Sequence, residues 1–76
     1  MTLGELPIGG SAVVSRVEGQ RPFRRRLLEL GLTPGTRVEV LRVAPLGDPI
    51  EILVRGYRLS LRRADAALVT LSRGAE

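Results

Sequence analysis

The second half of the chain alternates hydrophobic and polar positions in a way that predicts a β-hairpin. Residues 50–61, "IEILVRGYRLSL", become two strands if Arg55 and Gly56 form a two-residue turn. This register pairs Val54 with Tyr57, Ile52 with Leu59 and Ile50 with Leu61 on one apolar face. The opposite face is polar apart from Leu53. A slip of one residue would destroy the match, so the pattern determines the register well.

Three other stretches have the β-branched content or the alternation of short strands: residues 11–17, 36–44 and 67–72. Within 36–44 the apolar residues change parity after Val40, which predicts a bulge near Leu41 and Arg42. Residues 45–49, "PLGDP", are a loop on composition, and residues 63–66 are expected to form a single helical turn. Near the start of the chain, the apolar residues expected to cover one end of the core are Leu3, Leu6 and Ile8.

One helix of about nine residues is predicted between the first two strands. Pro22 suits the first helical position, where its missing N–H costs nothing. Phe23, Leu27 and Leu30 fall on one stripe at positions i, i+4 and i+7, so this stripe is expected to face the core. A helix this short is stable only when it is packed.

Glycines mark the end of the helix and the turn that follows it. Gly31 is placed to end the helix in a left-handed conformation, with Leu32 folding back as the hydrophobic contact that often accompanies such an end. Pro34 and Gly35 then predict a tight turn into the next strand.

These elements predict one mainly β domain over residues 1–76. Five short strands, a helix between the first two and a helical turn before the last indicate a small, strongly bent SH3-like β-barrel. An oligonucleotide-binding fold also has five strands and a helix. In that fold the helix usually follows the third strand, which does not match this order.

The composition lacks the side chains on which most enzymes and metal sites depend. The chain has no cysteine and no histidine, and hence no thiol nucleophile, no usual general base near neutral pH and no usual zinc or iron ligand. Glu51 and Asp65 stand isolated in the sequence, so no cluster of oxygen ligands is visible. We therefore expect a protein that is not an enzyme and has no cofactor or metal site. The absence of a leader or of a long apolar run favours a cytoplasmic protein that is not embedded in a membrane.

The stretch at residues 21–35, "RPFRRRLLELGLTPG", crowds arginines into the start of the helix. Positive charge there opposes the helix dipole, at a cost of about 0.3–1 kcal/mol for each residue. A pair between Arg25 and Glu29 would return only a few tenths of a kcal/mol, about the usual gain at this spacing. Helix stability therefore does not explain the cluster, and three interpretations stay open: a solvated face, a protein-docking surface or a grip on nucleic acid.

The aromatic residues argue against the nucleic-acid interpretation. Phe23 and Tyr57 are the only aromatic side chains, and the pattern assigns both to the core, where neither could stack on a base. The net charge of +4 favours an anionic partner only mildly. We therefore expect no specific nucleic-acid complex.

Three leucines have no place in the core pattern: Leu28, Leu46 and Leu53. Leu28 lies on the helix flank shared with Arg24, and an aliphatic side chain beside an arginine is typical of protein interfaces. The candidate partner-binding residues are Arg24, Arg25 and Leu28 on the helix, with Leu46 and Asp48 of the 45–49 loop as a second contact.

At this level of detail the sequence resembles a known family. "RRRLLELGLTPGTRVEVL", followed by "APLGDPIEILVRGYRLSLRRADA", is similar to the FeoA family of ferrous iron transport protein A. The residues that carry the resemblance are Arg26, Leu27, Leu30, Gly31, Leu32, Pro34, Gly35, Ala44 to Ile50, Leu59, Leu61, Arg62, Asp65 and Ala66. The resemblance as a whole covers about residues 3–71, and Asp65 stands where the family more often has glutamate.

The resemblance implies a function in addition to a fold. It implies an SH3-like barrel in the cytoplasm that assists FeoB, a membrane iron transporter with a cytosolic GTPase domain, by binding to it, and that is not an enzyme. It leaves room for a weak homo-oligomer. A similar domain ends metal-dependent repressors of the diphtheria-toxin-repressor type, so a nucleic-acid-binding or transcription-regulatory module is the alternative. Those repressors carry a winged helix, which we do not expect here.

Overall fold

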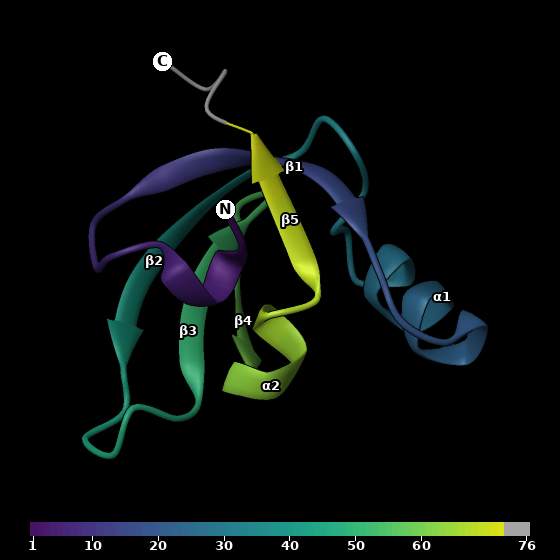
Figure 1. The fold of residues 1–76 in the computed structure, drawn as a ribbon. Helices are drawn as coiled ribbons and strands as arrows, with labels where there is room; N and C mark the ends of the chain where they lie inside the picture. Colours follow the sequence, from purple (N-terminus) through teal and green to yellow (C-terminus); the bar gives the residue numbers. More distant parts are fainter. Residues whose placement is uncertain (73–76) are drawn as a thin grey trace.

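The computed structural model describes residues 1–72, which form a five-stranded antiparallel sheet with short helical segments at its margins (Figure 1). In chain order the elements are η1 (Leu3–Glu5), β1 (Ser11–Val17), α1 (Arg21–Glu29), β2 (Arg37–Val43), β3 (Ile50–Val54), β4 (Tyr57–Leu61), α2 (Arg63–Ala66) and β5 (Val69–Ser72). The mainly β class and the helix between the first two strands are confirmed. The strand predicted over 36–44 is one residue shorter at each end. The strand predicted over 67–72 begins only at Val69, because Ala67 caps α2.

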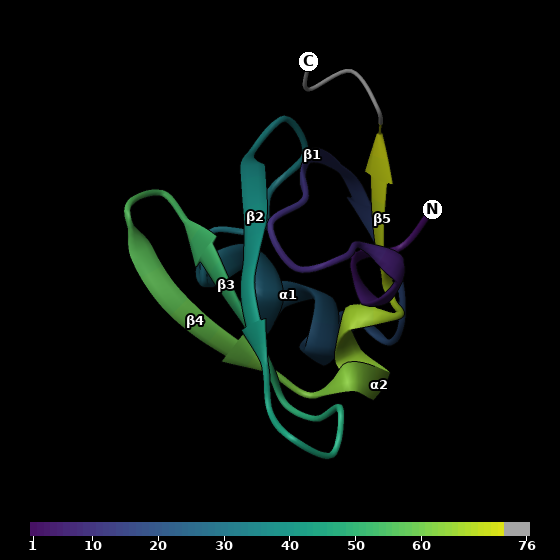
Figure 2. The same cartoon turned by 90° about the vertical axis from the view of Figure 1, so that its left-hand side faces the viewer.

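The strands follow the order β4-β3-β2-β1-β5, so β4 and β5 are the edges of an open, strongly bent sheet (Figure 1). Irregularities in two strands accompany the bend. The β2–β3 pairing shifts between Val40 and Arg42, which confirms the predicted bulge, and the β1–β5 pairing shifts between Val14 and Arg16. At the β5 edge, η1 packs beside α2 and β5 (Figure 2).

The β3–β4 hairpin has the predicted register. Ile50 pairs with Leu61, Ile52 with Leu59 and Val54 with Tyr57. Both turn residues have positive φ, 51° at Arg55 and 85° at Gly56, as a type I′ turn requires. The turn therefore matches the right-handed twist of the two strands.

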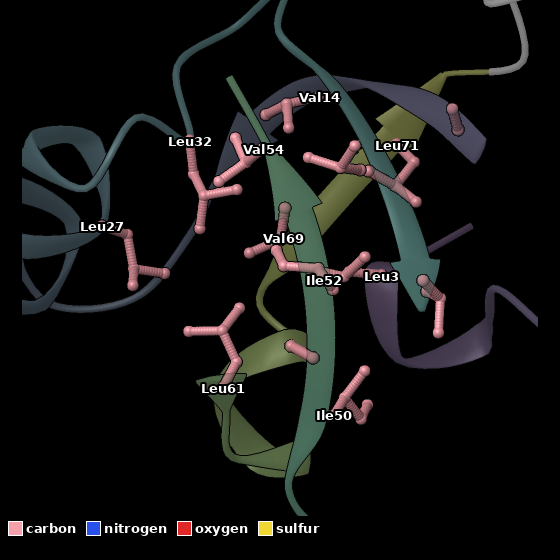
Figure 3. Packing of buried hydrophobic residues seen from close by; sticks show 14 residues of the cluster. Leu3, Val14, Leu27, Leu32, Ile50, Ile52, Val54, Leu61, Val69 and Leu71 are labelled. Carbon is pink, nitrogen blue, oxygen red and sulfur yellow. The ribbon is translucent and has the colours of Figure 1, made fainter. Parts of the chain in front are cut away.

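The core lies inside the bent sheet and is almost entirely aliphatic (Figure 3). Its buried members are Leu3, Ala12, Val14, Leu27, Leu32, Val38, Val40, Ile50, Ile52, Val54, Leu61, Ala66, Val69 and Leu71. Leu27 is the one fully buried residue of α1, while Phe23 and Leu30 pack against the core half-buried. The predicted stripe is thus confirmed, with Leu27 at its centre.

Two residues assigned to the core lie at the surface, so those assignments were wrong. Tyr57 is 42% exposed because it follows the hairpin turn on an edge strand, beyond the end of the core, and its hydroxyl donates to the carbonyl of Leu30. Ile8 is 63% exposed because it lies in the turn that the Gly10 N–H closes on the Pro7 carbonyl. Of the other N-terminal leucines, Leu3 is buried and Leu6 partly buried.

The end of α1 has the geometry of a Schellman motif. The Gly31 N–H donates to the Leu28 carbonyl at 3.0 Å and the Leu32 N–H to the Leu27 carbonyl at 3.1 Å. Gly31 has φ of 105°, a conformation strained for any side chain, and Leu32 folds back to full burial. Both features were predicted from the sequence.

The hairpin turn holds this helix end in place. Arg55 donates from Nη2 to Thr33 Oγ1 at 3.0 Å and to Thr36 Oγ1 at 3.2 Å, and from Nε to the Gly31 carbonyl at 3.4 Å. Together with the Tyr57 hydroxyl, these bonds connect the β3–β4 turn to the segment that follows α1. The orientation of α1 is therefore fixed from its C-terminal end as well as by Leu27.

Candidate partner-binding groove

A groove of about 520 Å³ runs between the outer face of α1 and the end of β1. In Figure 1, α1 lies at one side of the molecule, next to the end of β1 and away from the rest of the sheet. The groove is lined by Arg16, Val17, Arg21, Arg24, Arg25, Leu28, Glu29 and Pro34. Three of the five predicted contact residues, Arg24, Arg25 and Leu28, therefore share one hollow.

Helix geometry explains which side chains reach the groove. Leu27 points into the core, and Leu28, the next residue at 100° around the helix, turns toward the groove. Arg24 precedes Leu28 by one turn, and Arg21 precedes Arg25 by the same spacing. The short connection from β1 to α1 keeps Val17 opposite this face, and the Glu18 N–H anchors that connection on the Leu68 carbonyl at 2.8 Å.

The groove carries an excess of positive charge that the described part of the chain does not neutralise. Its lining has four arginines and one glutamate. Arg16 pairs with Glu18, with Nη2 2.7 Å from the carboxylate. Within residues 1–72, no ion pair or hydrogen bond engages the side chain of Arg21, Arg24 or Arg25.

The local pair considered for Arg25 does not form. Arg25 and Glu29 make no ion pair, although both line the groove. Arg26 instead turns toward Phe23, with its guanidinium carbon 5.8 Å from the ring centre. Of the four arginines in α1, three thus lie along the groove and one covers an aromatic ring.

The floor of the groove is apolar. Leu28 is 39% exposed, and Val17 and Pro34 line the same hollow. The aliphatic stems of the surrounding arginines extend this surface. The arrangement can hold an apolar side chain and, around it, several negative charges.

The second predicted contact lies elsewhere. The 44–49 loop joins β2 to β3 on the side of the molecule opposite α1 (Figure 1). Leu46 is 96% exposed at its tip, while Asp48 Oδ1 accepts from the Arg63 N–H at 2.9 Å. The structure therefore separates Leu46 and Asp48 from the groove and gives two distinct surfaces.

One leucine expected at the surface needs correction. Leu53 is half-buried between its cross-strand neighbours Glu39 and Arg58, so it is not an exposed anchor.

The carboxylate of Glu51 lies among positive charges and not among other acidic groups. Arg42 and Arg58 lie 3.7 and 3.9 Å from it. Within residues 1–72, no three acidic, histidine or cysteine side chains are grouped so that they could hold a metal ion. In the same part of the chain, no helix combines the length and hydrophobicity that a bilayer crossing needs.

Sequence reasoning missed five groove residues: Arg16, Val17, Arg21, Glu29 and Pro34. Arg21 and Glu29 could have been found, because they lie one helical turn before and after Arg25. The other three belong to β1 and to the turn after α1, and only the tertiary structure brings them to the helix.

A family model for the FeoA domain matches residues 1–73. The chain belongs to the FeoA family. It is 46% identical over 69 residues to the Fe(2+) transport protein A/Fe(2+) transporter FeoB fusion protein of Porphyromonas gingivalis (strain ATCC BAA-308 / W83). That match includes 91% of this FeoA chain and 8% of the much longer relative.

Solved FeoA structures have the same fold. The solution structure of FeoA from Chlorobium tepidum superposes with a TM-score of 0.91 at 45% identity, over 99% of this chain and 71% of that one. The crystal structure of Stenotrophomonas maltophilia FeoA in complex with zinc, described as a prokaryotic SH3 domain protein, gives a TM-score of 0.83 at 37% identity, over 95% and 89% of the two chains. The predicted family and the SH3-like fold are both confirmed.

Proposed function

We propose that this FeoA domain is a cytoplasmic accessory of ferrous iron uptake that binds a FeoB-type transporter. The observation that carries the proposal is the Porphyromonas gingivalis relative, in which a sequence 46% identical to this chain is fused to FeoB. Fusion in one polypeptide gives two domains a high effective concentration for each other. Domains that work together gain from that arrangement, and a separate chain needs an affinity of its own.

The groove beside α1 is the contact surface in this proposal. Interfaces draw most of their energy from a few buried apolar or arginine side chains. Arg24, Arg25 and Leu28 supply both kinds on one helix face. Leu46 and Asp48 provide a second contact only if the partner is large enough to reach the opposite side of the molecule.

The proposed role is binding that adjusts transport or GTP hydrolysis by the partner, and it needs no catalytic group in this chain. Residues 1–76 act as one domain in this account. A bound FeoA domain changes the partner only if it prefers one of the partner's conformations over another.

The test is a pull-down with FeoB from the same organism, comparing the wild type with a folded Arg24→Glu/Leu28→Glu variant. Circular dichroism confirms that the variant is folded. We expect the double variant to lose binding and a Leu46→Ser variant to show whether the second surface contributes. Equal binding by wild type and double variant would remove the groove from the interface. No binding by either would contradict FeoB as the partner.

A further inference from the structure

The positive charge of the groove indicates that its ligand carries negatively charged groups. Arg21, Arg24 and Arg25 lie within two turns of one helix and have no acidic partner in residues 1–72. The first turn of α1 has no acidic residue, so the positive end of the helix dipole adds to their field. A carboxylate between them would form charge-assisted hydrogen bonds and relieve the repulsion among the guanidinium groups.

The apolar floor of the groove indicates that the ligand also carries an apolar group. Leu28, Val17 and Pro34 remain in contact with solvent unless a ligand brings an apolar group to them. A simple anion such as phosphate would engage the arginines and leave this floor uncovered. A nucleic-acid strand fits poorly too, because no aromatic side chain lines the groove to stack on a base.

The size of the groove limits the ligand to a few residues. A volume of about 520 Å³ lies within the usual range of small-ligand sites, roughly 300–1,000 Å³. It suits one large side chain with parts of its neighbours, and it is too small for a packed domain face.

We propose that the groove binds an acidic segment of a partner protein through a central apolar side chain. That side chain packs on Leu28 and Val17, and flanking carboxylates pair with Arg21, Arg24 and Arg25. The proposal deepens the proposed function, on which it rests, by naming the chemistry of the partner segment. A second copy of this chain is the competing occupant, because its 44–49 loop carries the exposed Leu46 and the carboxylate of Asp48.

The experiment is an NMR titration of the ¹⁵N-labelled full chain with three short capped peptides. Ac-EELEE-amide carries both features, Ac-EESEE-amide lacks the apolar side chain, and Ac-KKLKK-amide reverses the charge. We expect Ac-EELEE-amide to shift the backbone amide resonances of groove residues, including Val17 and Leu28, with a Kd of about 1 mM. Each of the other two should bind at least about fivefold more weakly, because each loses one of the two contributions.

Protein variants assign the effect to the groove. Arg24→Glu and Leu28→Ser should each weaken binding of Ac-EELEE-amide by about fivefold or more. Arg62→Glu makes the same charge change as Arg24→Glu at an exposed residue outside the groove, so it serves as the matched control. It should change Kd by no more than about twofold.

Four results would overturn the inference. They are equal binding of Ac-EELEE-amide and Ac-EESEE-amide, shifts confined to another surface, no shifts at about 10 mM peptide, and self-association by sedimentation that Leu46→Ser abolishes. Equal binding of the two peptides would indicate a site for any anion. Self-association that Leu46→Ser abolishes would indicate that a second copy of the chain occupies the groove. The pull-down tests the proposed function separately. If FeoB binds the wild type and the Arg24→Glu/Leu28→Glu variant equally, only the assignment of the interface to the groove is wrong. If the peptide binds and FeoB does not, only the identification of FeoB as the partner is wrong.

Discussion

The adjacent leucines of α1 allow the packing of the helix and its groove to be tested separately. Leu27 is 1% exposed and is the one fully buried residue of the helix, whereas Leu28 is 39% exposed in the groove. Leu27→Ala removes buried methyl groups and leaves a cavity, which usually costs about 2–5 kcal/mol. Its half-buried neighbours Phe23 and Leu30 allow partial collapse, so we expect a loss of about 3 kcal/mol.

Leu28→Ala should be much milder. About 60% of the Leu28 surface is covered, and full burial of a leucine is worth about 1.5–3 kcal/mol. The free energy of unfolding should therefore fall by about 1 kcal/mol. Its larger effect should appear in binding to the partner.

Urea denaturation followed by circular dichroism measures both variants. A chain of 76 residues is expected to be stable by about 4–11 kcal/mol, with an m value near about 1 kcal/mol per molar urea. The midpoint should therefore fall by about 3 M for Leu27→Ala and by about 1 M for Leu28→Ala. If Leu27→Ala does not fold, Leu27→Met can be measured in its place, because this substitution should cost less than about 1.5 kcal/mol. A loss below about 1 kcal/mol for Leu27→Ala, or equal losses for the two leucines, would mean that α1 is not anchored as described.

Three other predictions concern the turn after α1, metals and nucleic acid. Gly31→Val should cost about 1–3 kcal/mol in the same assay, because φ of 105° strains a β-branched residue and the new Cβ would lie 3.2 Å from Arg55 Cδ. Gly31→Asn should be tolerated better. Anaerobic calorimetry with ferrous iron should show no one-to-one site of micromolar affinity in the isolated chain, and such a site would refute the prediction. Binding to duplex DNA should be no tighter than about 100 µM at physiological salt and should fall log-linearly with salt, whereas a specific nanomolar complex would favour the regulatory alternative.

Sequence alone predicted those features that local chemistry determines. The hairpin register follows from a period of two around Arg55 and Gly56, since a shifted register would expose one face of both strands. The helix end follows from Gly31, the residue type that tolerates positive φ. The bulge after Val40 follows from the change of parity in β2.

Features that depend on the extent of the core and on tertiary placement were harder to predict. Alternation assigned Tyr57 to the apolar face, but it does not tell how far along a strand the core extends. Arg16 and Val17 could not be connected with α1 before the path of the chain between them was known. For the same reason Leu46 was grouped with Leu28, although only Leu28 lines the groove and the loop that carries Leu46 lies on the side of the molecule opposite α1 (Figure 1).

The position of the arginines bears on whether the groove is functional or only a solvated face. Arg21 occupies the first turn of α1, where a positive charge costs about 0.3–1 kcal/mol, and nothing in residues 1–72 offsets that cost. Arg21→Glu removes this charge and adds a favourable one, so it should stabilise the domain by about 1 kcal/mol in urea denaturation. If Arg21 only faces solvent, the variant should gain stability and bind FeoB as well as the wild type. If the groove receives an acidic segment, the same variant should gain stability and lose binding, because a carboxylate would then face the carboxylates of the partner. Unchanged binding in the more stable variant would therefore favour the solvated face.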